Sequence, residues 1–179
     1  MNLIRCLTLL AYLAALLFSG LSSYSQNYQQ MVSVQNSSGT TLTSQADIVA
    51  KYATLLNVPK DSIKNISLYT LIEQYSGTPY KYGGTDVKGV DCSGFSCAIE
   101  KQVYGLTIPR TVSLQAAGAK PKTIANLKEG DLVFLKSHTL GVYLMNGYFA
   151  EVTSNAGLVL NNLNDPDMQQ RIASCGSFK

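Results

Sequence analysis

The chain has 179 residues, of which 46% are hydrophobic and 14% are charged, and its formal net charge is +3. This length and apolar content suit one domain with a well-developed core. The small charge comes with no basic run and no cationic patch interleaved with aromatic residues, so the composition argues against nucleic acid as a partner.

The N-terminus has the pattern of a targeting signal. Arg5 precedes a short apolar run from Leu7 to Phe18, and small residues follow at Ser23 and Ser25. The pattern predicts a secretory signal peptide over residues 1–25, because the run is short for a membrane span. An uncleaved anchor is the alternative. No cysteine directly follows the run, so we expect a secreted or periplasmic protein without a stable membrane anchor once the signal is removed.

The composition changes after the signal. Residues 26–43 are rich in Gln, Asn, Ser, Thr and Gly, which predicts a linker or a loosely ordered arm. The domain itself is expected over residues 44–179, with residues 44–66 as an N-terminal helical extension. Apolar residues at helical spacing predict a helix from Ser44 that ends at Pro59, and a second one from about Ser67 to Gly77.

The second half of the chain reads differently. After Gly130 the apolar period changes from helical to alternating, and Asn146-Gly147 is a strong signal for a two-residue hairpin. Short strands are predicted over residues 131–135, 140–145, 148–152 and 157–160. Helices followed by an antiparallel meander predict an α+β fold.

A glycine-rich loop from Gly77 delivers Cys92 to the first turn of a helix with Phe95, Ile99 and Val103 on its apolar face. A thiol at a helix N-terminus is favoured as a thiolate by the helix dipole, and free backbone N–H groups there can bind an oxyanion. Cys92 is therefore a candidate nucleophile. The alternative is a small buried cysteine that starts an ordinary core helix.

Four segments carry a family resemblance. They are Gly-Thr-Pro-Tyr-Lys-Tyr-Gly-Gly at 77–84, Asp-Cys-Ser-Gly-Phe at 91–95, Ile-Pro-Arg-Thr at 108–111 and Gly-Asp-Leu-Val-Phe at 130–134. In this order they resemble the NlpC family of papain-like cysteine peptidases, which cut peptidoglycan stem peptides. The resemblance implies a papain-like NlpC fold, with the nucleophile at a helix N-terminus packed on an antiparallel β-meander.

The resemblance places a histidine base on the strand after residue 137, and His138 is the only histidine in the chain. Two residues separate His138 from Gly141, where the family has one. In a regular strand Thr139 would take the base position, because side chains alternate, whereas a bulge would turn His138 toward Cys92. Glu151 aligns with the family's orienting residue, and a carboxylate can orient an imidazole.

The resemblance also implies that the Tyr80 hydroxyl lies near the oxyanion region, and that Asp91 and Ser93 contact the polar ends of the substrate peptide. Simpler interpretations exist for each of them. Asp91 and Ser93 can cap the helix, and Tyr80 can be a half-buried loop aromatic. Arg110, in the third segment, is interpreted as a solvated or salt-bridged arginine.

Three cysteines follow the predicted signal, namely Cys92, Cys97 and Cys175. Cys92 and Cys97 are five residues apart on one helix, which is poor disulfide geometry. A Cys97–Cys175 bond that leaves Cys92 free is one alternative in an oxidising compartment. No Cys-x-x-Cys and no His/Cys cluster occurs, so neither a metal nor a cofactor is expected.

We therefore expect a secreted, monomeric cell-wall cysteine endopeptidase that hydrolyses an amide bond of the peptidoglycan stem peptide, by resemblance the bond after D-glutamate. Cys92 would attack, His138 would transfer the proton, and Glu151 would orient His138. The alternative is a catalytically impaired NlpC-like module that binds wall fragments or a partner protein without cleavage. A third alternative is a related hydrolase acting on another amide.

Overall fold

The structure is a computed structural model that describes residues 44–179. The predicted signal peptide over 1–25 and the predicted linker over 26–43 lie outside the described residues. Within the described part, no helix is both long enough and apolar enough to cross a membrane.

Two helices open the described part. Helix α2 (Gln45–Leu55) begins after Ser44, whose hydroxyl accepts a hydrogen bond from the Asp47 N–H as an N-cap should. A short 3-10 turn, η1 (Lys60–Ser62), leads to helix α3 (Ile66–Gln74). The predicted start of the first helix is confirmed, but the helix ends at Leu55, four residues before Pro59. The second helix ends three residues before Gly77, because the chain already turns at Ser76 and Gly77, where Gly77 has φ of 77°.

The central loop contains two very short paired strands, β1 (Thr85–Asp86) and β2 (Gly89–Val90), which the sequence did not predict. Helix α4 (Cys92–Tyr104) follows directly and ends at Gly105, whose φ of 71° suits a glycine C-cap. Helix α5 (Val112–Gly118) comes next. The predicted Cys92 helix and its apolar face are confirmed, with Phe95 and Ile99 buried.

A six-stranded antiparallel sheet fills the second half of the domain, in the order β3-β8-β4-β5-β6-β7. The four predicted strands are confirmed, and Asn146 and Gly147 both have positive φ, as the hairpin signal requires. The strands are β3 (Lys120–Lys122), β4 (Leu132–Leu135), β5 (Leu140–Tyr143), β6 (Tyr148–Thr153), β7 (Gly157–Asn162) and β8 (Ile172–Ser177). The 3-10 turn η2 (Ile124–Asn126) and helix α6 (Pro166–Arg171) complete the domain.

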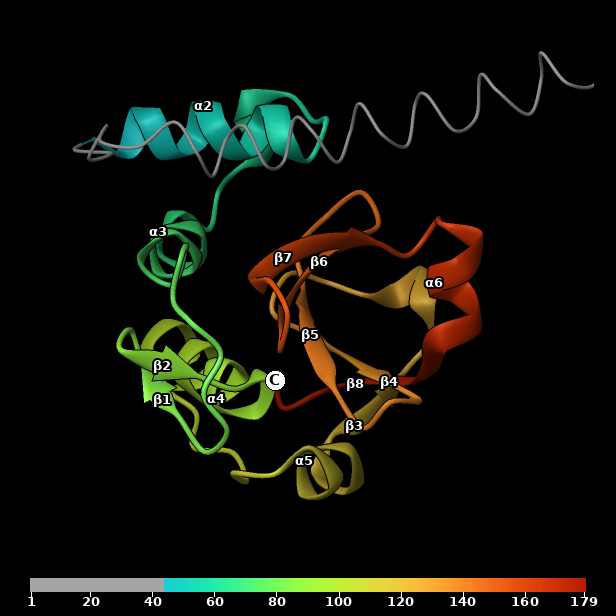
Figure 1. The fold of residues 1–179 in the computed structure, drawn as a ribbon. Coiled ribbons are helices and arrows are strands. Elements are labelled where there is room, and N and C mark those ends of the chain that lie inside the picture. Colours follow the sequence, from blue (N-terminus) through green and yellow to red (C-terminus); the bar gives the residue numbers. More distant parts are fainter. Residues whose placement is uncertain (1–43) are drawn as a thin grey trace, which may run out of the picture. The chain divides into compact units, whose positions relative to one another are not determined.

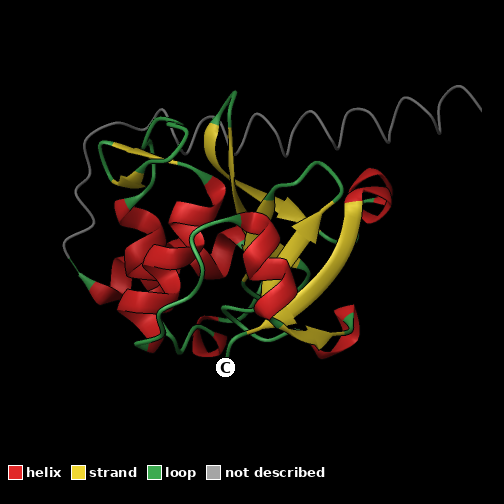
Figure 2. Cartoon of the chain, turned by 90° about the horizontal axis from the view of Figure 1, so that it is seen from below, coloured by secondary structure: helices red, strands yellow, loops and turns green. Residues whose placement is uncertain are grey.

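Most of the helices gather on one side of the strands, and α4 lies along that side while α6 lies beyond the sheet (Figures 1 and 2). The main core is formed by residues of α2, α3 and α4 with one face of the sheet, and a smaller core lies on the other face with Met168 of α6. The predicted α+β fold is confirmed. The N-terminal end of α4 therefore lies against β5 of the sheet.

All three cysteines of the described residues are free thiols. Cys97 packs against the main core, whereas Cys175 belongs to the smaller core on the opposite face of the sheet. The two side chains therefore lie on different faces, and a bond between them would require the sheet to be displaced.

Candidate active site

Cys92 is the first residue of α4 and its side chain is nearly buried, with 7% exposure. Backbone N–H groups of Ser93 and Leu140 are directed at the sulfur and favour the thiolate. Burial is the larger influence, and the negative charges of Asp91 and Glu151 act in the same direction. The net result is that the pKa of the Cys92 thiol is raised, so in this conformation the sulfur is protonated near neutral pH.

Asp91 caps helix α4 and is held on both oxygens. Its Oδ1 accepts a hydrogen bond from the Gly94 N–H and its Oδ2 accepts one from the Gly83 N–H, both at 2.7 Å. Arg110 donates to each oxygen at 2.9 Å. Burial alone would raise the pKa of Asp91, but the hydrogen bonds from Arg110, Gly94 and Gly83 together hold it below its ordinary value. The capping interpretation of Asp91 and the salt-bridge interpretation of Arg110 are confirmed.

Ser93 lies beside this carboxylate rather than at a cap position. Its hydroxyl donates to Asp91 Oδ1 at 3.1 Å and accepts from Arg110 at 2.7 Å, and the side chain is buried. Contacts from Asp91 and Ser93 to a substrate peptide stay a prediction. In the structure both side chains form hydrogen bonds that hold the loop and the start of α4 in place.

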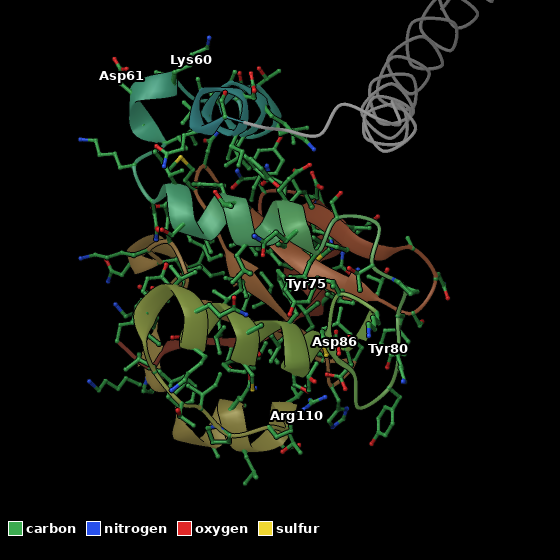
Figure 3. All side chains as sticks on the ribbon, turned by 90° about the vertical axis from the view of Figure 1, so that its left-hand side faces the viewer. Lys60, Asp61, Tyr75, Tyr80, Asp86 and Arg110 are labelled. Atoms are coloured by element: carbon green, nitrogen blue, oxygen red, sulfur yellow. The ribbon has the colours of Figure 1, made fainter. Side chains whose placement is uncertain are left out.

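Tyr80 lies on the loop beside the start of α4, where Figure 3 labels it near Asp86. Partial burial raises the pKa of its phenol, and negative charge at Cys92 and Asp91 raises it further. The resemblance implies that this hydroxyl stabilises the oxyanion of the reaction. That role itself stays a prediction.

His138 lies in the turn between β4 and β5, and its side chain is exposed. The turn is closed by a hydrogen bond from the His138 N–H to the Leu135 carbonyl at 3.1 Å and by one from the Leu135 N–H to the Thr139 carbonyl at 2.9 Å. His138 has φ of 58°, the left-handed value at which a three-residue hairpin loop forms its bulge. Within residues 44–179 no hydrogen bond involves its imidazole. The structure therefore does not bring His138 to Cys92.

Thr139 takes the position expected for the base. Its hydroxyl donates to Glu151 Oε1 at 3.0 Å, and Leu140, whose N–H points at the Cys92 sulfur, is the next residue. Of the two alternatives for the register, the structure has the one in which Thr139 replaces His138. The bulge that absorbs the extra residue lies in the turn, so it turns the imidazole outward instead of inward.

Glu151 is 2% exposed on β6 and pairs across the sheet with Gly141. Burial raises its pKa, which hydrogen bonds from Thr139 and Asn161 and the charge of Arg171 partly offset. Asn161 donates to Oε2 at 2.8 Å, and the Arg171 guanidinium lies 3.8 Å from Oε1. Asn161 and Arg171 were missed by the sequence reasoning, because neither lies in a recognised segment. Asn161 reaches Glu151 from the neighbouring strand β7, and Arg171 reaches it from the end of α6.

The described site thus holds a nearly buried thiol, two backbone N–H groups directed at its sulfur, and a carboxylate fixed by hydrogen bonds, with the Tyr80 loop beside them. Threonine cannot accept a proton near neutral pH, so this conformation has no base in contact with the sulfur. Among residues 44–179 no group of three His, Cys, Asp or Glu side chains is arranged to hold a metal.

A cysteine that starts a helix packed on an antiparallel sheet defines the class of papain-like cysteine peptidase domains. The profile of the NlpC/P60 family matches residues 77–176, more than half of the chain, and the chain belongs to this family. The predicted family resemblance is confirmed. Membership of the family establishes the fold. It does not by itself establish which residue of this chain acts as the base.

Named relatives are similar over the same region. The chain is 29% identical to the murein DD-endopeptidase MepS/murein LD-carboxypeptidase of Escherichia coli K12 over 61% of this chain and 62% of that protein. It is 33% identical to the probable endopeptidase NlpC of the same organism, over 59% of this chain and 73% of that protein. The crystal structure of an NlpC/P60 family protein from Bacillus cereus has a TM-score of 0.59 and 26% identity, over 64% of this chain and 40% of that chain. The chain therefore spans less than two thirds of the length of MepS.

Proposed function

We propose that this chain is a cell-wall hydrolase, a cysteine endopeptidase that cleaves an amide bond of the peptidoglycan stem peptide, by family resemblance the bond after D-glutamate. The observation that carries the proposal is the placement of Cys92, a nearly buried thiol at the start of α4 with two backbone N–H groups directed at its sulfur. Such donors stabilise the thiolate, and the oxyanion of the tetrahedral intermediate would be bound by free backbone N–H groups at the start of α4. The name of MepS, a murein DD-endopeptidase, supports the substrate class, and the name of NlpC, a probable endopeptidase, supports the reaction.

Proton transfer in this proposal falls to His138, and it requires the β4–β5 turn to change conformation. A left-handed backbone costs a residue other than glycine about 1–2 kcal/mol, so leaving φ of 58° removes a strain. The turn is held by two backbone hydrogen bonds and by the contact between the Ser137 and Thr139 hydroxyls at 3.0 Å. Substrate that binds the inward state more tightly would shift the turn toward it. The Glu151 carboxylate would then accept a hydrogen bond from the imidazole and orient it, and its hydrogen bond from Thr139 would be lost.

A second candidate function, recognition of wall peptides without cleavage, is favoured by the Thr139–Glu151 hydrogen bond. If that bond is kept when ligand binds, the thiol stays protonated and the cleft acts as a binding site. The Tyr80 loop and the Asp91–Arg110 network are equally available to this function.

The test is to incubate purified peptidoglycan and a soluble disaccharide-tetrapeptide with the full chain, with Cys92→Ala and with His138→Asn, and to separate the products by chromatography and mass spectrometry. Asparagine tolerates the left-handed turn, so His138→Asn removes the imidazole and keeps the loop. Release by the wild type alone supports the hydrolase with His138 as base, and release that persists in His138→Asn assigns the base elsewhere. Binding by calorimetry without release supports the second candidate. Neither release nor binding rejects both functions.

The proposal includes export, since its substrate lies outside the cytoplasm. Removal of residues 1–25 during secretion would produce an N-terminus near Gln26, and mass spectrometry of the protein recovered from the cell envelope or the medium tests this. An intact N-terminus on exported protein would indicate an uncleaved anchor.

A further inference from the structure

The loop before α4 carries an unusually exposed aromatic side chain. Five large apolar or aromatic side chains are exposed within residues 44–179, and three of them, Tyr80, Tyr82 and Val87, fall on this loop. Tyr82 is the most exposed at 88%. A tyrosine that contributes nothing to the core and stands on the surface is a candidate contact for a ligand, because an aromatic ring has a large apolar face and a polar tip.

The backbone beneath Tyr82 is fixed. Lys81 and Gly84 close a tight turn through the Gly84 N–H and the Lys81 carbonyl at 2.8 Å, and Gly83 within it has φ of 74°. The Lys81 N–H donates to the Val90 carbonyl at 3.0 Å, and the Gly83 N–H donates to the Asp91 carboxylate at 2.7 Å. Tyr82 is therefore held at the corner of a rigid turn, and binding to it costs little backbone entropy.

The same hydrogen bonds attach this turn to the candidate active site. Tyr80 forms a bridge with Val90, two residues before Cys92, so the segment from Tyr80 to Gly83 runs alongside the start of α4. Figure 3 shows Tyr80 and Asp86 at this end of α4, with Arg110 on the other side of the helix start. Tyr82, two residues after Tyr80, is thus an exposed residue of the loop that runs beside the candidate active site.

We infer that Tyr82 is a stacking platform for a pyranose ring of the glycan strand to which a bound stem peptide is attached. The inference rests on the proposed function in either form, because both need a stem peptide in the Cys92 cleft. A ring that is 88% exposed offers its flat apolar face to the C–H face of a sugar and its hydroxyl to the sugar's polar groups. Exposed Lys81, Asp86 and Lys88 on the same loop supply donors and acceptors for hydroxyl and acetamido groups.

The experiment compares a disaccharide-tetrapeptide with the same tetrapeptide carrying an N-lactoyl cap, called the free peptide below, so that neither ligand has a charged α-amine and the two differ in the sugar. Binding is measured by calorimetry on the full chain in a Cys92→Ala background, which prevents turnover. We expect the sugar-bearing ligand to bind more tightly than the free peptide. Tyr82→Ala should weaken the sugar-bearing ligand about fivefold to tenfold, as expected for the loss of one aromatic contact, and should leave the free peptide within about twofold. Tyr82→Trp keeps an aromatic face and should retain the preference for the sugar.

Ile124→Ala is the matched control, because Ile124 is another exposed apolar residue, on η2 and outside this loop, and its truncation should change neither affinity. Equal affinity of the Cys92→Ala protein for both ligands, or an equal loss for both ligands in Tyr82→Ala, overturns the platform and leaves the peptide cleft intact. Failure of both ligands to bind overturns the proposed function together with this inference. Tyr82 is almost fully exposed, so an unchanged unfolding midpoint is expected and any effect reports on binding.

Discussion

The hydroxyl of Thr139 donates a hydrogen bond to the carboxylate of Glu151 at 3.0 Å, and both residues lie where the two strands β5 and β6 approach the start of α4. The bond joins the position expected for a base to the position expected for the group that orients it. Because threonine fills the first position, the carboxylate is fixed but has no imidazole to orient. The state of this pair decides whether the Cys92 sulfur can be activated.

Replacing Thr139 with histidine should therefore increase hydrolysis. The new imidazole would lie within reach of Glu151 and next to Leu140, whose N–H already points at the sulfur. A positioned general base contributes about 100-fold or more over a site without one, so we make the comparison in the His138→Asn background and expect Thr139→His to raise the release of peptide fragments there by about that factor. Thr139→Val, which has the same shape and no proton-accepting group, is the control and should give no increase. A folded His138→Asn/Thr139→His protein with the same rate as His138→Asn would show that residue 139 does not face the thiol.

The charge of Glu151 should also affect the reactivity of the Cys92 thiol. Burial is the main reason that the pKa of Cys92 is raised, and the Glu151 carboxylate adds to it. In Glu151→Gln that negative charge is gone, so the thiolate fraction at a given pH increases. We expect the alkylation rate of Cys92 at pH 8, followed by mass spectrometry of its peptide, to rise about threefold, because the thiolate is the reactive form. Glu73→Gln is the control, because Glu73 pairs with Lys51 on the helical extension. A rate that falls in Glu151→Gln would contradict this electrostatic account.

The sequence predicted those parts of the fold whose local pattern is unambiguous. The cap at Ser44, the apolar face of α4 and the Asn146-Gly147 hairpin each depend on residues that are close in the chain. Strand β8 was not predicted, because Ile-Ala-Ser-Cys-Gly-Ser has no apolar alternation and is held by pairing with β3 and β4 on both sides. Long-range pairing of this kind leaves no periodic signal in the segment itself.

The candidate site could also be predicted only where the signal is local in the sequence. Motif order was enough to find Cys92, Asp91 and Tyr80, and the extra residue before Gly141 was enough to state two alternatives for the base. The choice between them depends on where the hairpin loop places its bulge, which is decided by backbone conformation at His138 and by hydrogen bonds across the turn. Neither quantity can be obtained from residue identities alone.

Arg110 should contribute to stability with a defined pH dependence. It donates to both oxygens of the nearly buried Asp91, so Arg110→Ala leaves that carboxylate without its cation and should reduce the free energy of unfolding by about 2 kcal/mol. The pKa of Asp91 is lowered in the folded state, so its stabilising effect is complete above the ordinary aspartate range and is lost as the pH falls through the folded-state pKa. The difference between wild type and variant should thus be largest at neutral pH and shrink below about pH 4.

Urea unfolding at several pH values measures this difference. The control is Arg171→Ala, since Arg171 is half exposed and 3.8 Å from Glu151, and it should cost less than about 1 kcal/mol. Equal losses in the two variants, or a difference that does not change with pH, would show that Arg110 acts through packing and not through Asp91.

Glu100 should affect stability with the opposite pH dependence to that of Asp91. It is fully buried on α4, and neither of its carboxylate oxygens has a hydrogen-bond partner. Burial raises its pKa, and the positive charge of Lys179 offsets this only in part while Asp131 adds to it. The folded state therefore holds the proton to a higher pH than the unfolded chain does. Stability must fall as the pH rises from the ordinary glutamate range to the folded-state pKa, and it stays reduced above that value.

Glu100→Gln removes the ionisation and keeps the shape, and Glu100→Met also removes the unsatisfied polar atoms. At pH 7.5 we expect both variants to unfold with a free energy about 1–2 kcal/mol higher than wild type, measured by urea denaturation. At pH 4 wild-type Glu100 is protonated, so the advantage of Glu100→Gln should disappear. If the wild type is the most stable of the three proteins at pH 7.5, the carboxylate must be ionised and paired with Lys179, and the account of an isolated buried acid fails.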